Sequence, residues 1–247
     1  MPDEEQVAQL LARIEPPGDG TAQVSRPDDV TGELARLLQW WHAVGSTAAP
    51  VVSRPVPTQD STSLTDGIAA ADRAIDAGAS LLVAPPSTPD DVAARALIAL
   101  LTRREPQSVV HQPPGTSDAD WMALVSRVRD TSAARADLRG DPLELARSLD
   151  DGVIVWTTGM LLAAAARRTP CLVDGTSAWA AALVADRLSH RAHGWWRPGS
   201  TSPDPARGAA MDRIGLHDAL PLGLSDDSGR GSSATIELLR SVAETID

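Results

Sequence analysis

The chain has 247 residues, of which 43% are hydrophobic and 22% are charged, and this composition is typical of a globular protein with a buried core. Its formal net charge of -11 argues against nucleic acid as a partner, because binding to a phosphate backbone needs clustered cations. Cys171 is the single cysteine, which excludes an internal disulfide and a cysteine zinc cluster.

The N-terminus and the apolar runs favour a cytoplasmic location. The longest uncharged apolar run, residues 152–166, is shorter than the ~20 residues that cross a bilayer. The first five residues are Met-Pro-Asp-Glu-Glu, which are acidic where a secretory signal is basic. We therefore expect a cytoplasmic protein without a membrane partner.

The N-terminal part of the chain is expected to be helical. Residues 7–14 and 34–41 carry apolar side chains at the spacing i, i+3, i+4, i+7, which is typical of an amphipathic helix. A stretch rich in Ser, Thr and Pro follows at 45–63 and predicts a linker or long loop. The expected organisation is an N-terminal helical segment (1–44), this linker, and an α/β domain (64–247).

From residue 64 onward, short apolar runs alternate with helical stretches. Buried strands are expected at 80–84, 108–111 and 170–174. Helices are expected at 64–77, 89–103, from 117, from 141, 152–168, 176–188, from 204, and 232–246. Apolar strands that are too short to alternate are typical of a parallel sheet covered on both faces. The predicted fold is therefore α/β, a Rossmann-like three-layer arrangement with small helical additions from both termini.

Ligands of parallel sheets usually bind at the carboxyl ends of the strands. Asp174 and Gly175 end a predicted strand, and they form either a ligand-facing turn or the N-cap of the next helix. Gly229, Arg230 and Gly231 precede the last helix, where backbone N–H groups and a guanidinium can hold an anion. A structural turn is the other interpretation of this glycine loop.

Two histidines near residue 190 have a spacing that can ligate a metal. His190 and His193 are separated by two residues, which suits a metal ion when both lie on one helix face. The neighbouring sequence offers no evident third ligand. We therefore favour a surface pair beside Trp195 and Trp196, and we expect neither a metal nor a cofactor.

Several motifs in the second half of the chain resemble one enzyme family. Residues 161–175 read Leu-Leu-Ala-Ala-Ala-Ala-Arg-Arg-Thr-Pro-Cys-Leu-Val-Asp-Gly, and an Ala-Ala-Ala-Leu run follows at 180–183. Ile-Gly-Leu at 214–216 and Leu-Gly-Leu at 222–224 then precede the glycine loop. In order and spacing these motifs are similar to the A-A-R-R-x-P-V-x-x-D-G and G-L…L-G-L patterns of nicotinate-nucleotide:dimethylbenzimidazole phosphoribosyltransferases. These enzymes make α-ribazole phosphate for the lower ligand of cobalamin.

The resemblance also implies where ligands bind. Weaker similarity reaches back to Gly67 and includes Gly115-Thr116, where the family has a G-T-G turn. Ligand contacts are implied at Gly115, Asp174, Gly175, Gly229, Arg230 and Gly231. The expected ligands are nicotinate mononucleotide and a benzimidazole-type base.

The chemical groups of the family are altered in this chain. Alignment of the C-terminal motifs places Ser228 where the family has its catalytic glutamate, the base that takes the benzimidazole proton as nitrogen attacks the ribose anomeric carbon. Asp226 and Asp227 lie beside this position, either as relocated bases or as part of a solvated acidic loop. The glycine-rich phosphate loop of the family is replaced by Pro-Pro-Ser-Thr-Pro-Asp-Asp at 85–91, which has fewer N–H donors and more negative charge.

We therefore expect a divergent, shortened family member with weak or no transferase activity, in effect a pseudoenzyme. The first alternative is an active phosphoribosyltransferase with a relocated acidic base and a changed acceptor. The second is a non-catalytic partner subunit. Residues 44–63 are too few for the family's D-H-G-V strand and the units after it, which supply part of the benzimidazole pocket. The dimers of the family imply a homodimer, or a heterodimer with a paralogue.

Overall fold

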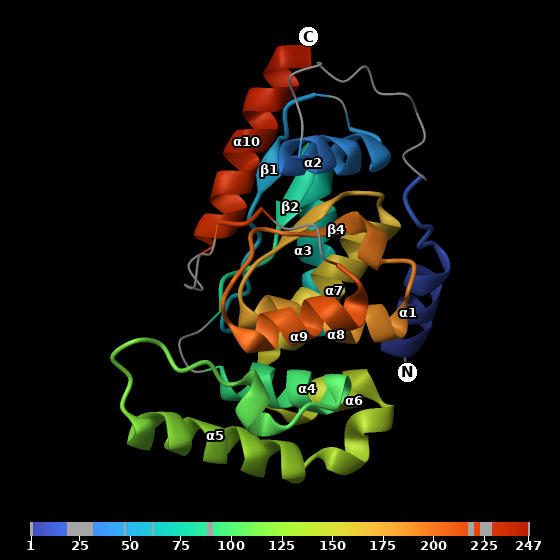
Figure 1. Cartoon of the computed structure of the whole chain (residues 1–247). Helices are drawn as coiled ribbons and strands as arrows, with labels where there is room; N and C mark the ends of the chain where they lie inside the picture. Colours follow the sequence, from blue (N-terminus) through green and yellow to red (C-terminus); the bar gives the residue numbers. More distant parts are fainter. Residues whose placement is uncertain are drawn as a thin grey trace.

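The computed structural model gives the fold of most of the chain (Figure 1). It describes residues 2–18, 32–46, 48–60, 62–87, 91–216, 220–222 and 229–246. The catalytic candidates Asp226, Asp227 and Ser228 lie outside the described residues. The predicted ligand-binding residues lie within them.

Four short strands form one parallel sheet at the centre of the molecule (Figure 1). The strands are β1 (Val52–Ser53), β2 (Leu81–Val83), β3 (Cys171–Val173) and β4 (Trp196–Pro198). They lie in the order β1-β2-β3-β4, and every neighbouring pair is parallel. Leu82 lies opposite Cys171, and Cys171 lies opposite Trp196. The predicted α/β fold with a parallel sheet is confirmed.

Ten α-helices surround this sheet in the described part of the chain. They are α1 (Pro2–Ala12), α2 (Gly32–Ala43), α3 (Leu64–Asp76), α4 (Val92–Thr102), α5 (Asp118–Ala133), α6 (Pro142–Ser148), α7 (Gly152–Ala166), α8 (Thr176–Leu188), α9 (Pro205–Ile214) and α10 (Arg230–Ile246). Three 3-10 turns, η1 (Pro106–Val109), η2 (Ala136–Gly140) and η3 (His193–Trp195), join some of them. Each predicted helix has a counterpart among these, with ends that differ by a few residues, and residues 89 and 90 of the helix expected at 89–103 lie outside the described residues. Several begin at a capping side chain, such as Ser63 for α3, Asp151 for α7 and Asp204 for α9.

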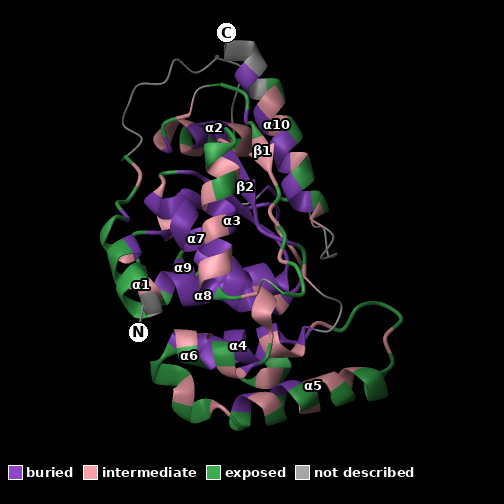
Figure 2. Cartoon of the chain, turned by 180° about the vertical axis from the view of Figure 1, so that it is seen from behind, coloured by how far each residue is buried: buried purple, intermediate pink, exposed green. Residues whose placement is uncertain are grey.

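The helices form layers around the sheet. α3, α7 and α8 pack against one another in that order, and the view of Figure 2 has α3 and α7 toward the reader. α2 and α10 contact each other near β1 (Figure 1). α4, α5 and α6 come between β2 and β3 in the chain and form a separate layer, with α5 outermost. α7 is almost entirely buried (Figure 2), and no helix of the described residues is long and apolar enough to span a membrane.

The contact between α3 and α7 requires glycine on both helices. A Cβ atom on Gly67 of α3 would lie 1.9 Å from the carbonyl oxygen of Trp156 in α7. A Cβ atom on Gly159 of α7 would lie 2.1 Å from the carbonyl oxygen of Leu64 in α3. Both clashes are with backbone atoms, so the two helix backbones could not approach this closely with any other residue at either position.

The adjacent arginines of the Ala-Ala-Arg-Arg motif connect the end of α7 to neighbouring elements. Arg167 donates to Asp76 at 2.7 Å and to Asp72 at 3.0 Å, both in α3. The hydrogen bond to Asp76 contributes most to raising the pKa of Arg167 above its ordinary value. Arg168 pairs with Glu15, which follows α1. The motif therefore has a structural role in the packing of α1, α3 and α7.

One predicted strand is wrong and two observed strands were not predicted. Residues 106–109 form η1 and not the strand expected at 108–111. Val109 is nonetheless buried, because η1 packs against α4 and the Val109 carbonyl accepts a hydrogen bond of 2.7 Å from Arg95. β1 lies in the stretch expected to be a linker, and β4 reads Trp-Arg-Pro, so neither has the apolar run by which β2 and β3 are identified.

Candidate functional site

The carboxyl ends of the four parallel strands meet at one edge of the sheet. Ligands of α/β proteins usually bind at this edge. Arg54 follows β1, residues 84–87 follow β2, Asp174 follows β3, and Gly199 follows β4. The N-terminus of α10 also reaches this edge, through the contacts described next.

Asp174 connects β3 to two helices at this edge. Its side chain is buried, and Oδ2 accepts a hydrogen bond of 3.0 Å from the backbone N–H of Ser232 in the first turn of α10. Oδ1 lies 3.4 Å from Nη1 of Arg207 in α9, which is also buried. The carboxylate is thus compensated by a guanidinium and by a helix N-terminus. The alternative that the Asp174-Gly175 turn forms the N-cap of the next helix is confirmed, because Gly175 is the N-cap residue of α8, with a φ of +92° and no side-chain hydrogen bond.

Gly231 allows α10 to approach the end of β4. A Cβ atom on this residue would lie 2.3 Å from Oγ of Ser200 and 2.9 Å from Oδ2 of Asp174. Thr235, one turn further along α10, donates to the carbonyl oxygen of Gly199. The side chain of Ser200 is buried, and its Oγ has no hydrogen-bond partner among the described residues. A buried hydroxyl of this kind can bind a polar group of a ligand.

Arg54, which follows the outer strand β1, also reaches the start of α10. Its Nη2 donates to Oγ of Ser233 at 3.0 Å, and this Oγ in turn donates to the carbonyl oxygen of Gly229 at 3.1 Å. Gly229 has a φ of +76°, a left-handed conformation that glycine adopts without strain. Because Arg54 is exposed, it can also meet an anionic ligand. Sequence reasoning missed Arg54, since it follows a strand that had not been predicted.

The structure brings most of the predicted ligand-binding residues to one edge of the sheet. The residues that lie there are Asp174, Gly175, Gly229, Arg230 and Gly231. Gly115 lies elsewhere, in the exposed loop between η1 and α5 that projects from the body of the molecule (Figure 1). The contacts of Ser232 with Asp174 give the glycine loop a structural role in addition to any role in binding.

The turn after β2 caps α8. Oγ of Ser87 accepts a hydrogen bond of 2.8 Å from the backbone N–H of Ser177, in the first turn of α8. Pro85 and Pro86 in the same turn have no N–H group. The N–H group of Ser177, at the N-terminus of α8, is therefore bonded to a protein side chain and is not available to a phosphate. This agrees with the loss of the family's phosphate loop from the same turn.

Cys171 is not available as a nucleophile. It is fully buried in β3, and burial raises the pKa of its thiol above the ordinary value. The thiolate is the reactive form of cysteine, so this residue has a packing role. Among the described residues, a group that could hold a metal ion is Asp186, His190 and His193, at the far end of α8.

Comparisons with known proteins agree on one kind of enzyme. The family model described as Phosphoribosyltransferase matches residues 56–247. The chain is 32% identical to the Mycobacterium tuberculosis nicotinate-nucleotide–dimethylbenzimidazole phosphoribosyltransferase over 257 aligned positions, covering 98% of this chain and 70% of that protein. The protein of the same name from Corynebacterium efficiens is 35% identical over 184 positions, covering 72% of this chain and 49% of that protein. The crystal structure of CobT from Thermus thermophilus matches with a TM-score of 0.66 at 27% identity, covering 78% of this chain and 58% of that one.

Proposed function

Because the chain belongs to the nicotinate-nucleotide–dimethylbenzimidazole phosphoribosyltransferase family, we propose that it is a divergent member that retains ligand binding and has weak or no transferase activity. The proposed ligands are a nicotinate nucleotide and a benzimidazole-type base. The related step in metabolism is the synthesis of the lower ligand of cobalamin.

The observation that best supports this proposal is that the carboxylate of Asp174 is already bound by other groups of the protein. In the family reaction, a benzimidazole nitrogen attacks the ribose anomeric carbon, the bond to nicotinate breaks, and a base takes the remaining benzimidazole proton. Asp174 lies at the correct edge of the sheet, but it already accepts from Ser232 and pairs with Arg207. Its role is to hold α10 in place. With Ser228 at the aligned position of the glutamate, the chain lacks a carboxylate at that position.

The strand ends keep groups that suit an anionic, hydroxyl-rich ligand. Arg54 and Arg230 are exposed cations at the start of α10, and both can face a phosphate. The buried hydroxyl of Ser200 can bond a ribose hydroxyl or a phosphate oxygen. We assign these three residues to binding and none of them to proton transfer.

Two measurements on the unmodified protein test this proposal. Isothermal titration with nicotinate mononucleotide is expected to give saturable binding that Arg54→Ala weakens. Mass-spectrometric detection of α-ribazole phosphate, in a mixture that also contains dimethylbenzimidazole, is expected to give little or no product. Absence of binding supports a non-catalytic partner subunit instead, and rapid product formation contradicts the loss of activity.

A relocated base is the second candidate function, because Asp226 and Asp227 flank the aligned position. It predicts rapid turnover by the unmodified protein and loss of that turnover in Asp227→Asn or Asp226→Asn. If both variants turn over at the same rate as the unmodified protein, this candidate is excluded.

We further propose a homodimer, or a heterodimer with a paralogue, as the working assembly. The chain spans 58% of the length of the Thermus thermophilus structure, so a second subunit could complete the benzimidazole pocket. Light scattering is expected to give twice the chain mass of 25.9 kDa for the homodimer. A mass of one chain that doubles only on adding the paralogue supports the heterodimer.

A further inference from the structure

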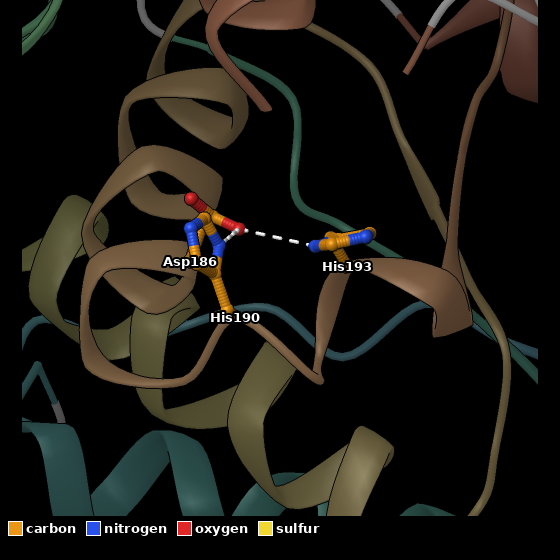
Figure 3. A group of neighbouring side chains, drawn as sticks. All are labelled: Asp186, His190 and His193. Atoms are coloured by element: carbon orange, nitrogen blue, oxygen red, sulfur yellow. Dashed lines mark hydrogen bonds and ion pairs between the residues drawn. The ribbon is translucent and has the colours of Figure 1, made fainter. Parts of the chain in front are cut away.

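The end of α8 carries three side chains that converge on one point and that the candidate site does not use (Figure 3). Asp186 lies in α8, His190 follows this helix, and His193 begins η3. Nδ1 of His190 lies 2.9 Å from Oδ1 of Asp186, and Nδ1 of His193 lies 3.2 Å from the same oxygen. Figure 3 shows both imidazole rings presenting a nitrogen to the carboxylate.

The separations of the two histidine nitrogens from Oδ1 of Asp186 are close to those in a tetrahedral metal site. The three ligand atoms all lie within 4.8 Å of one another. A tetrahedral ion bound at about 2.0–2.2 Å holds its ligand atoms ~3.3–3.5 Å apart. The distances of 2.9 Å and 3.2 Å to Asp186 therefore need to lengthen by only a few tenths of an ångström. Rotation of the two imidazole rings can supply this change.

The burial of Asp186 supplies a reason for a cation at this point. This residue is 2% exposed, and a buried carboxylate is unstable without a compensating positive charge. Two imidazole nitrogens face this carboxylate, and a divalent ion held between them and the carboxylate would supply a positive charge. The side chains of His190 and His193 are 73% and 39% exposed, so a bound ion would be accessible from solvent and could take water as a fourth ligand.

We propose that Asp186, His190 and His193 form a binding site for a divalent transition-metal ion, with Zn²⁺ as the best fit. Two imidazole nitrogens and one carboxylate oxygen suit Zn²⁺, whereas Mg²⁺ and Ca²⁺ prefer ligand sets made entirely of oxygen. Cys171 is buried in β3 and is not a ligand. Sequence reasoning missed this site because the third ligand lies inside a largely apolar helix, one turn before His190.

The position of this site gives the ion a structural role. It joins the end of α8 to η3, which leads directly into β4. η3 also supports the segment after α1, because Nε1 of Trp195 donates to the carbonyl oxygen of Glu15 at 2.7 Å. The site lies where β4 begins, and the candidate ligand site lies where β4 ends. Metal binding is therefore expected to stabilise the fold independently of nucleotide binding.

Titration of the tag-free, chelator-treated protein with Zn²⁺ tests this proposal. We expect one ion per chain, and an affinity that His190→Gln and His193→Gln each weaken by about tenfold or more. The matched control is His111→Gln, which changes a histidine between η1 and α5 and is expected to bind as the unmodified protein does. Because His190 is largely exposed, its variant should fold, and circular dichroism of the metal-free proteins checks this.

A spectroscopic measurement supplies an independent readout. Co²⁺ in place of Zn²⁺ should give the visible absorption bands of a tetrahedral site with nitrogen and oxygen ligands, and these bands should disappear in His193→Gln. Zn²⁺ should also raise the thermal unfolding temperature of the unmodified protein and not that of His190→Gln. The proposal is overturned if Zn²⁺ does not bind saturably, or if both variants bind it as tightly as the unmodified protein does. It is also overturned if Mg²⁺ binds as tightly as Zn²⁺.

Discussion

Asp151 is a half-buried acid whose titration should affect the stability of the fold. Its Oδ1 accepts from the backbone N–H of Val153 at 3.0 Å and begins α7. Burial is the larger effect, and it raises the pKa of Asp151 above the model-compound value of 3.8. The folded protein therefore holds this proton more tightly than the unfolded chain does. This contribution to stability is present below pH 3.8 and is lost as the pH rises through the folded pKa.

Asp151→Asn keeps a capping acceptor and removes the ionisation. We expect the free energy of unfolding of the variant, taken as the difference from that of the unmodified protein at the same pH, to be greater at pH 7 than at pH 4. Urea unfolding at both values measures this difference. Asp141→Asn, at the exposed cap of α6, is the matched control and should show a smaller change. A relative stability of Asp151→Asn that falls between pH 4 and pH 7 would contradict the account.

The site residues that follow a strand were predictable only where that strand was predictable. Asp174 follows an apolar run that is clearly a buried strand, so its place at the ligand edge could be inferred from the sequence. Arg54 and Ser200 follow β1 and β4, which contain too few apolar residues to be recognised. Their contacts with α10 join chain segments that are far apart in the sequence. Local patterns of residues cannot predict such contacts.

At the scale of elements, the close packing of α3 on α7 requires glycine at position 67. In Gly67→Ala the new methyl group meets the backbone oxygen of Trp156, which cannot rotate away as a side chain does. We expect a loss of about 1–3 kcal/mol or more in the free energy of unfolding, as in overpacked cores. Urea unfolding measures this loss.

The control for Gly67→Ala is Gly208→Ala, in the interior of α9. A Cβ atom there has no heavy atom within 4 Å, so the variant should gain about 0.4–1 kcal/mol from the reduced freedom of the unfolded chain. Equal stability of the two variants would show that α3 and α7 do not pack as closely as described.

The start of α10 similarly requires glycine at position 231. Gly231→Ala places a methyl group against Ser200 and Asp174, so the first turn of α10 must move away from β4. We expect faster hydrogen exchange in residues 230–240 and a weaker affinity for nicotinate mononucleotide. Ser233→Ala, which removes the contacts of this hydroxyl with Arg54 and with the Gly229 carbonyl but adds no atom, is the control for exchange. Unchanged exchange in Gly231→Ala would mean that α10 does not depend on this close approach.

Helices were more predictable than strands, for a physical reason. Helices in the described part of the chain have apolar spacing or capping residues that are local in sequence, such as the Ser63 and Asp66 capping box of α3. A strand of two or three residues has no such local signal, and it forms only when a neighbouring strand is present. The segment at 108–111 has strand-like residues but packs against α4, so its burial arises without a sheet partner.

At the scale of the whole molecule, the two ends of the sheet have separate roles. The carboxyl edge collects Asp174, Arg54 and the start of α10, and it carries the proposed nucleotide site. The amino edge of β4 carries the proposed metal site and supports the segment after α1. Because the sites are separate, loss of one is not expected to abolish the other.

We propose that a phosphoribosyltransferase scaffold persists here without its general base. Ser228→Glu restores a carboxylate at the aligned position, while Ser228→Gln has the same size and cannot accept the proton as a carboxylate does. With nicotinate mononucleotide and dimethylbenzimidazole as substrates, we expect the Ser228→Glu variant to form α-ribazole phosphate ~10²–10⁴-fold faster than the unmodified protein and the Ser228→Gln variant. Equal rates for all three proteins, with nicotinate mononucleotide bound in each, would contradict the claim.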